Sequence, residues 1–400
     1  MLLVVNPNNR LRTSLAAIEP PLWAGLCASF LGADILDAEA EDLTLEETES
    51  RIRAFYPNAV LIVVMGNNPS VSSTPKMPVA EALADRIKDL NVSFTGIHPI
   101  AVNYQKYPVI KYPFDGFPMM PWDKLPMHLY KAHNWHCLDG SPRTPYASIY
   151  TSLGCPFDCY YCPIHTLYGD RRVKFRPVKD VLIEVDILTG RYGVKNIKIW
   201  DELFALNEDR VLSICSGLRD YNLNIWAYAR VDTVTEGMLG AMKKAGINWL
   251  AYGFESVTDP KFIKRTAEVI NMTRDAGINI MANFMFGLPG ATIDDDRRSL
   301  DWAKSQLFEF VNFYDAMPYP GSQWFEDVKP LPDWSLNPHT GRSFSQYICP
   351  TPFRRMAFKE YFTNPEYLGM IRSKFGVQGE EQIKEMLSQN DNARWVSPVR

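Results

Sequence analysis

The chain has 400 residues, a length that predicts two or three domains rather than one. Hydrophobic residues make up 46% and charged residues 22%, the composition of an ordinary globular protein. The formal net charge of −4 argues against a nucleic-acid-binding surface, which usually carries a basic excess. The first residues do not read as a signal peptide, and no apolar run approaches the roughly 20 residues that span a bilayer. The sequence therefore predicts a cytoplasmic protein without a membrane segment.

The first hundred residues alternate short apolar runs with helical patterns. Strands are predicted at residues 1–6, 33–37, 59–65 and 92–97. Helices are predicted between them, at 22–31, 45–55 and 79–90. This alternation predicts an α/β, doubly wound Rossmann-like domain over residues 1–98. Its ligand-binding loops would follow the strands, at 6–10, 66–75 and 96–99.

A proline-rich stretch follows this domain. Eight prolines fall between residues 99 and 145, so the stretch is predicted to be a linker that crosses the surface between two domains. His133, His136 and Cys137 could bind a metal, but Trp135 and the prolines favour a packed segment.

A second alternating pattern occupies residues 146–317. Strands are predicted at 146–152, 196–200, 224–229, 248–254, 279–286 and 310–317. Helices are predicted between them, at 178–188, 211–218, 237–244, 263–275 and 296–306. Six such units predict a partial (β/α)6 barrel of the TIM type. Residues 318–400 are predicted to be a helical extension that packs on the barrel and covers its mouth.

Three of the seven cysteines, Cys155, Cys159 and Cys162, fall within eight residues, directly after the first predicted barrel strand. Three thiolates on one tight loop can each bind one iron of a cubane and leave the fourth iron without a protein ligand. The spacing therefore favours a reactive [4Fe–4S] cluster. The alternatives are a structural zinc site, with His165 as the nearby fourth ligand, and reduced thiols without a metal.

This loop resembles the signature of the radical S-adenosylmethionine (SAM) superfamily, Cys-x3-Cys-x-aromatic-Cys after the first strand of a partial barrel. The resemblance covers about residues 146–317. It implies that the open iron chelates SAM and that one electron cleaves SAM to methionine and a 5′-deoxyadenosyl radical. An electron donor such as flavodoxin or ferredoxin would supply that electron.

The resemblance also implies residues that contact SAM. Glu202, which follows Asp201 at the end of the second barrel strand, would receive the SAM ammonium group, and Arg230 its carboxylate or ribose. The remaining expected contacts are the ribose hydroxyls for Glu255 and Ser256, and the adenine for Tyr161 and Asn283.

A doubly wound domain in front of such a barrel resembles the cobalamin-binding subfamily. The expected contacts with the corrin and its tail are small residues that follow the strands, namely Gly66, Ser70, Ser72, Ser73 and Gly96. The Asp-x-His-x-x-Gly motif of this subfamily is missing, since no histidine precedes His98. Cobalamin is therefore expected to bind without an imidazole ligand from that motif.

The leading interpretation is a cobalamin-dependent radical SAM methyltransferase that acts on an unactivated carbon of a small molecule or peptide. The alternatives are a radical SAM enzyme of the same architecture that catalyses cyclisation or rearrangement, and a non-catalytic iron–sulfur or zinc protein. The sequence identifies no catalytic residue beyond those that would hold cofactors.

Overall fold

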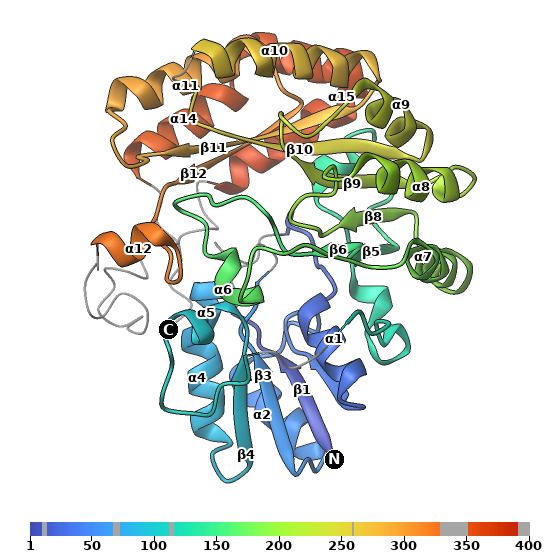
Figure 1. The fold of residues 1–400 in the computed structure, drawn as a ribbon, viewed down its shortest axis with the longest axis vertical. Coiled ribbons are helices and arrows are strands. Elements are labelled where there is room, and N and C mark those ends of the chain that lie inside the picture. The colour runs from blue at the N-terminus through green and yellow to red at the C-terminus, as the bar shows by residue number, and fades with distance from the viewer. Residues whose placement is uncertain (10–13, 67–72, 112–115, 258–259, 329–350, 391–400) are drawn as a thin grey trace.

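The structure is a computed structural model that describes residues 1–9, 14–66, 73–111, 116–257, 260–328 and 351–390. Two parallel sheets lie one above the other, and the N-terminal sheet is the lower one in Figure 1. None of the described helices is long and apolar enough to cross a membrane.

The N-terminal sheet has four parallel strands in the order β2-β1-β3-β4. The strands are β1 (Leu2–Asn6), β2 (Asp34–Asp37), β3 (Ala59–Val63) and β4 (Asn91–Thr95). The helices are α1 (Leu22–Phe30), α2 (Leu45–Ala54), α4 (Met77–Arg86) and α5 (Ile97–Ala101). Because β2 and β3 flank β1 on opposite sides, the chain reverses its direction of winding between β1 and β3. Such a reversal opens a crevice at the carboxyl ends of the strands, as predicted.

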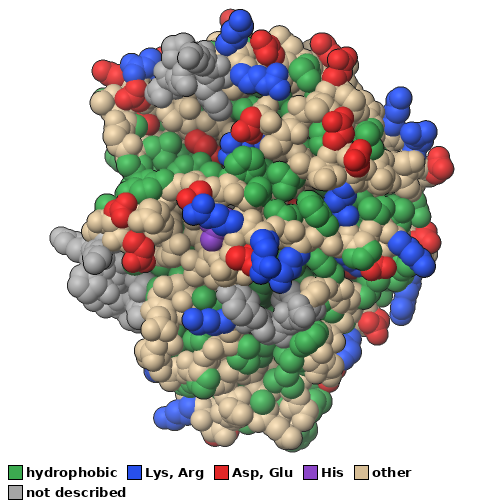
Figure 2. All heavy atoms as spheres, viewed as in Figure 1, with side chains coloured by type: hydrophobic (Ala, Val, Ile, Leu, Met, Phe, Trp, Pro, Cys, Tyr) green, Lys and Arg blue, Asp and Glu red, His purple; other side chains and the backbone are tan. Residues whose placement is uncertain are grey.

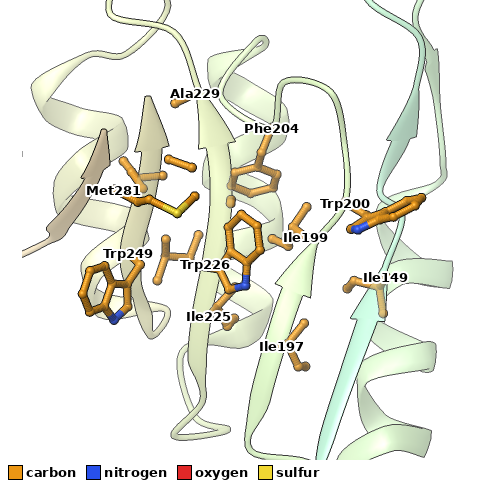
Figure 3. Close-up of a cluster of buried hydrophobic side chains, with 14 of the residues drawn as sticks. Ile149, Ile197, Ile199, Trp200, Phe204, Ile225, Trp226, Ala229, Trp249 and Met281 are labelled. Carbon is orange, nitrogen blue, oxygen red and sulfur yellow. The ribbon is translucent and has the colours of Figure 1, made fainter. Parts of the chain in front are cut away.

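The second sheet has six parallel strands in the order β12-β11-β10-β9-β8-β5. The strands are β5 (Tyr146–Ile149), β8 (Asn196–Ile199), β9 (Asn224–Ala229), β10 (Ile247–Glu255), β11 (Asn279–Phe286) and β12 (Phe310–Asp315). The helices that connect them are α7 (Val178–Tyr192), α8 (Glu208–Leu218), α9 (Glu236–Lys244), α10 (Pro260–Asp275) and α11 (Ile293–Gln306). Figure 3 shows buried side chains from neighbouring strands, among them Ile197 and Trp226, aligned across this sheet. The sheet ends at β5 and β12, which do not pair, so the predicted partial barrel is confirmed.

The first barrel strand is shorter than predicted. β5 ends at Ile149, and Ser152–Leu153 forms a separate strand, β6, that pairs antiparallel with β7 (Lys174–Phe175). β6 precedes the cysteine loop and β7 follows it, so their pairing brings the two ends of the loop together.

The proline-rich stretch is packed around Trp135, as the sequence favoured there, and this part is buried more deeply than a linker that only crosses the surface. Trp135 packs edge-on against Trp226 and Trp249 and stacks on Phe310, near the first residues of β9, β10 and β12. The neighbouring His136 is buried, its ring nitrogens have no hydrogen-bond partner among the described residues, and burial lowers its pKa to about 3. Residues Asn134–Cys137 form a short 3-10 helix, and four aromatic rings in contact hold it against the strands, so this segment closes the amino end of the barrel.

A buried ion pair joins the β1–α1 connection to the barrel. Glu19 is 5% exposed, and its carboxylate lies 3.0 Å from the ammonium of Lys198 on β8. The indole of Trp200 also donates to Glu19, at 3.0 Å. The N-terminal unit is therefore fixed to the inside of the barrel through buried polar contacts.

The described part of the C-terminal extension divides between the two ends of the barrel. Its helices are α12 (Gln323–Val328), α14 (Pro352–Phe362) and α15 (Pro365–Asn390), the last interrupted at Gly376. Trp324 of α12 stacks on Tyr160 in the cysteine loop, at the mouth. Tyr361 of α14 donates to the Phe308 carbonyl, and Phe375 of α15 stacks on Trp249. The prediction that the extension covers the mouth therefore fits α12. Helix α14 begins beside Asp315 at the carboxyl end of β12 and runs to Phe308 near the amino end, where α15 also packs.

Candidate active site at the carboxyl end of the barrel

A cavity of about 620 Å3 opens at the carboxyl ends of the barrel strands. The sequence-predicted cluster and SAM residues all line it: Cys155, Cys159, Tyr161, Cys162, Glu202, Arg230, Glu255, Ser256 and Asn283. These residues come from the cysteine loop and from the ends of β8, β9, β10 and β11. The fold thus brings together side chains that are up to 128 positions apart in the sequence.

Backbone contacts hold the cysteine loop in a tight turn. The Cys162 amide donates to the Cys159 carbonyl at 2.9 Å, and α6 (Ile164–Tyr168) begins directly afterwards. The ring nitrogens of His165 lie 2.8 Å from the Phe157 carbonyl and 3.3 Å from the Asp170 carbonyl. His165 therefore braces the loop backbone from within α6.

The three thiols are half-buried, and burial raises the pKa of each, that of Cys162 to about 12. Among the described residues, no three His, Cys, Asp or Glu side chains converge closely enough to bind one metal ion. A zinc site needs such convergence, whereas a cubane binds each thiolate to a different iron. Three thiols on one loop are the donor set that a cubane with one open iron requires.

The two carboxylates after β8 hold the strand ends and the cysteine loop. Asp201 is buried and accepts from the Thr151 amide and the Ser152 hydroxyl, both at 2.6 Å. Glu202 accepts from the Gly154 amide at 3.0 Å and from the Tyr168 hydroxyl at 2.7 Å. Burial raises the pKa of Glu202 to about 7. Glu202 therefore touches the loop one residue before Cys155 and also lines the cavity.

The end of β10 is shaped to present Glu255. Its backbone is left-handed, with φ of 56°, at a point where the register with β11 shifts. A Cβ on Gly253 would lie 2.5 Å from the Glu255 carboxylate, so a larger residue there would make this side chain shift from its position. The Tyr161 hydroxyl hydrogen-bonds this carboxylate, but burial dominates and raises its pKa to about 7.

Arg230, at the end of β9, lies on the cysteine loop. Its Nε and Nη2 donate to the two carboxylate oxygens of Asp232 at 2.8 and 2.7 Å. The guanidinium lies 3.9 Å from the centre of the Phe157 ring, and Nη1 is 3.9 Å from the Cys159 sulfur. Arg230 thus contacts the cysteine loop at Phe157 and Cys159, and it also lines the cavity.

Asn283 lines the cavity from β11 and is already hydrogen-bonded. Its amide donates to the Tyr252 carbonyl, and its oxygen accepts from Asn312 of β12, both at 3.1 Å. It therefore links three neighbouring strands at the cavity wall.

Sequence reasoning missed other residues of the cavity. Phe157 and Asp232 orient Arg230, and Tyr168 donates to Glu202. The cavity is also lined by aromatic residues that no motif marks, Tyr228, Tyr314 and Tyr319. Only the position of Phe157 inside the cysteine motif was a usable signal.

The carboxyl edge of the N-terminal sheet carries a buried polar network. Lys76, which is 2% exposed, donates to Asn6 at 2.6 Å and to Glu39 at 2.7 Å. Asn6 donates to Asp37 at 2.8 Å, and Tyr130 donates to Asp37 at 2.9 Å. The network spans the ends of β1 and β2 and the start of α4, at the predicted crevice.

The small residues predicted to contact cobalamin have different environments. The Gly66 amide donates to the Ser73 hydroxyl at 3.1 Å, which ties the two ends of the loop together. Gly96 has φ of 114°, and a Cβ there would lie 2.2 Å from the Val64 carbonyl. Its missing side chain is thus required by the packing of β3 against the turn after β4, so a larger residue at Gly96 would disturb the fold itself. Ser70 and Ser72 lie outside the described residues.

Comparisons with known proteins agree with this architecture. The sequence model of the radical SAM superfamily matches residues 149–303. An uncharacterized methyltransferase of Pyrococcus horikoshii is 26% identical over an alignment of 391 positions. The match covers 82% of this chain and 82% of that protein.

Two solved structures share the fold. TsrM, a radical S-adenosylmethionine methyltransferase from Kitasatospora setae with cobalamin and a [4Fe–4S] cluster bound, superposes with a TM-score of 0.63 and 17% identity, covering 86% of this chain and 84% of TsrM. OxsB, a cobalamin-dependent S-adenosylmethionine radical enzyme, superposes with a TM-score of 0.60 and 12% identity, covering 98% of this chain and 73% of OxsB. Residues 149–303 therefore match the radical SAM superfamily, and the chain as a whole has the fold of TsrM and OxsB.

Proposed function

We propose that this chain is a cobalamin-dependent radical SAM methyltransferase that holds one [4Fe–4S] cluster on Cys155, Cys159 and Cys162 and methylates an unactivated carbon of a small molecule or peptide. The observation that carries the proposal is the shared cavity: the three cysteines and every predicted SAM-contacting side chain line it. The alternative cyclisation or rearrangement chemistry would use the same cavity.

The donor set fits the cluster. Three thiols on one loop can each bind one iron of the cluster. His165, the nearest other possible ligand in the sequence, has its ring nitrogens beside two backbone carbonyls. When bound, the cluster would supply the electron that cleaves SAM, taken from a donor such as flavodoxin or ferredoxin, and cobalamin would carry the methyl group.

The cavity wall offers groups suited to SAM. The carboxylate of Glu202 has lone pairs beyond those used by Gly154 and Tyr168, and these can accept the SAM ammonium. On the other side, Glu255 and Ser256 can receive the ribose hydroxyls, and Asn283 lies farther along the wall for the adenine. These residues would bind and orient SAM, and the surrounding apolar side chains would exclude water.

The N-terminal sheet is the proposed cobalamin site. Its crevice lies at the reversal between β1 and β3, and α5, which follows β4, packs on α6, which follows the cysteine loop. The carboxyl edge of this sheet therefore faces the cluster side of the barrel. Gly66 and Ser73 would hold the loop beneath the corrin, and no histidine from residues 1–97 could reach the cobalt. TsrM and OxsB, which share this fold, support the assignment.

Anaerobic reconstitution with iron, sulfide and cobalamin tests the proposal. We expect about four irons per chain, a cobalamin spectrum, and release of 5′-deoxyadenosine or methylated product when a reductant and SAM are added. Gly66→Trp should block cobalamin uptake and leave the iron content unchanged, whereas Gly190→Trp, on an open face of α7, should change neither. A wild-type protein that takes up the cluster but no cobalamin would exclude the methyltransferase and leave the cyclisation or rearrangement chemistry.

A further inference from the structure

The guanidinium of Arg230 is fixed on three sides by described residues. Asp232 receives two of its five N–H groups, from Nε and Nη2, at 2.8 and 2.7 Å. One face of the guanidinium covers the Phe157 ring at 3.9 Å from its centre. A planar guanidinium in such a fork-and-stack arrangement has few orientations left, so the direction of its remaining group, Nη1, is set by the protein.

That remaining group points at a proposed cluster ligand. Nη1 lies 3.9 Å from the Cys159 sulfur, within the range of a hydrogen bond to sulfur. Phe157 and Cys159 both belong to the cysteine loop, so Arg230 contacts the loop at a ring and at a sulfur two residues apart. The resemblance to the superfamily assigns Arg230 to SAM, but these guanidinium contacts lead to the loop and to Asp232.

We infer that Arg230 is a positioning residue of the cluster, which donates to the Cys159 thiolate and raises the reduction potential of the cluster, and that it is not a ligand of SAM. The inference rests on the proposed function, because it requires the cluster on Cys155, Cys159 and Cys162. Reduction adds one negative charge to the cluster, and a fixed cation that donates to a ligating sulfur stabilises the reduced form more than the oxidised form. Hydrogen bonds to sulfur and local charge are known determinants of cluster potential.

The contacts of Arg230 with Asp232 and Phe157 determine how each substitution of Arg230 should change the reduction potential of the cluster. Arg230→Gln removes the positive charge and most of the donors while it keeps a side chain of moderate length. Arg230→Lys keeps the charge, but an ammonium cannot donate to both Asp232 oxygens in a planar fork and cover the Phe157 face as well. The potential should therefore decrease most in the Gln variant and less in the Lys variant.

The test is a potentiometric titration of the reconstituted full-length protein, followed by electron paramagnetic resonance, together with SAM affinity. In Arg230→Gln we expect unchanged iron content, a more negative midpoint potential and unchanged SAM affinity. Arg274→Gln is the matched control, because Arg274 is a half-buried arginine over the Phe308 ring that does not line the cavity. Its potential should match that of the wild type.

The outcomes separate the inference from the proposed function. A direct SAM ligand would lose about 10- to 100-fold in SAM affinity without a change in potential, and that result would overturn the inference. If Arg230→Gln assembles no cluster, the Lys variant decides: a lowered potential supports the inference, and a wild-type potential overturns it. A wild-type protein that assembles no cluster at all would instead contradict the proposed function.

Discussion

The two sheets of this chain end in different kinds of polar edge. At the barrel edge, carboxylates such as Glu202 and Glu255 line an open cavity beside the three cysteines. At the N-terminal edge, Asn6, Asp37 and Lys76 are each 2% exposed and bond to one another. The first edge presents its polar groups to a ligand, whereas the second uses them to fix the strand ends.

The difference indicates how the two proposed cofactors would be held. A cluster and SAM require specific donors, so their residues form a recognisable motif and converge on one cavity. A large corrin can be bound over a broad, shaped surface, and a rigid polar network beneath the loops would maintain that shape. Substitutions at the barrel edge should therefore affect cofactor binding, and substitutions at the N-terminal edge should affect the stability of the fold.

The largest effect is expected at the barrel edge. Cys159→Ala should abolish cluster assembly, because one iron loses its protein ligand, and with it all SAM cleavage. Iron and sulfide analysis after anaerobic reconstitution measures this. Cys215→Ala, a buried thiol of α8 away from the cavity, should retain the cluster. Equal losses in both variants would mean that the three-cysteine assignment is wrong.

At the N-terminal edge, Lys76→Met should mainly destabilise the fold. It leaves Asn6 and Glu39 without the ammonium that donates to both, and removal of one partner of a buried pair costs about 3–5 kcal/mol. Urea unfolding of the metal-free protein measures the change.

The control for Lys76 is another lysine of the same domain. Lys106 also pairs with two carboxylates, Glu81 and Asp85, but it is 46% exposed, so Lys106→Met should cost less than about 1 kcal/mol. If the two substitutions destabilise the protein equally, the N-terminal network is not the structural element described above.

The sequence was sufficient to predict both sheets and the place of the cysteine loop at the end of the first barrel strand. Long β-branched runs and alternating helices have strong periodicity, and the cysteine spacing is rarely produced by packing alone. The ends of individual elements were less predictable: β5 stops at Ile149 because the chain turns there to pair β6 with β7. Such a turn depends on a strand that is about 20 residues away in the sequence.

Contacts made by ordinary residues could not be predicted. Trp135 closes the amino end of the barrel against three aromatic rings, those of Trp226, Trp249 and Phe310, and although a packed segment was expected there, no local pattern identifies these partners. Lys76 follows a serine- and proline-rich loop, and neither its burial nor its pairing with Glu39 leaves a local pattern. These features follow from tertiary proximity, which periodicity does not encode.

The pH dependence of stability provides a finer test of the N-terminal network. Burial raises the pKa of Asp37 from 3.8 to about 6, despite hydrogen bonds from Asn6, Ala40 and Tyr130. The folded chain therefore binds this proton more tightly than the unfolded chain. The resulting stabilisation, about 3 kcal/mol, is fully present below pH 4 and is lost as the pH rises through about 6.

Asp37→Asn has no such proton to bind. The difference in the free energy of unfolding between wild type and variant, measured in urea at several pH values between about 4 and 7, should change by that amount. A constant difference across this range would show that Asp37 does not titrate there, and that the network is better solvated than its burial implies.

The smallest effect is expected at Glu202, which both lines the cavity and accepts hydrogen bonds from Gly154 and Tyr168. Glu202→Gln removes the negative charge that would face the SAM ammonium, and a hydrogen bond to a charged group contributes about 1.5–3 kcal/mol. SAM affinity in the cluster-loaded protein should therefore fall by about 10- to 100-fold, as measured by equilibrium binding under anaerobic conditions. The Gln side chain can still accept from Gly154 or Tyr168, so the cysteine loop should keep its shape and its iron.

The control is Glu208→Gln. Glu208 is an exposed carboxylate at the start of α8 that does not line the cavity, so this variant should bind SAM like the wild type. If Glu202→Gln loses iron instead of SAM affinity, the carboxylate acts mainly as a brace for the loop, and the barrel edge is then more like the N-terminal edge than the cavity suggests.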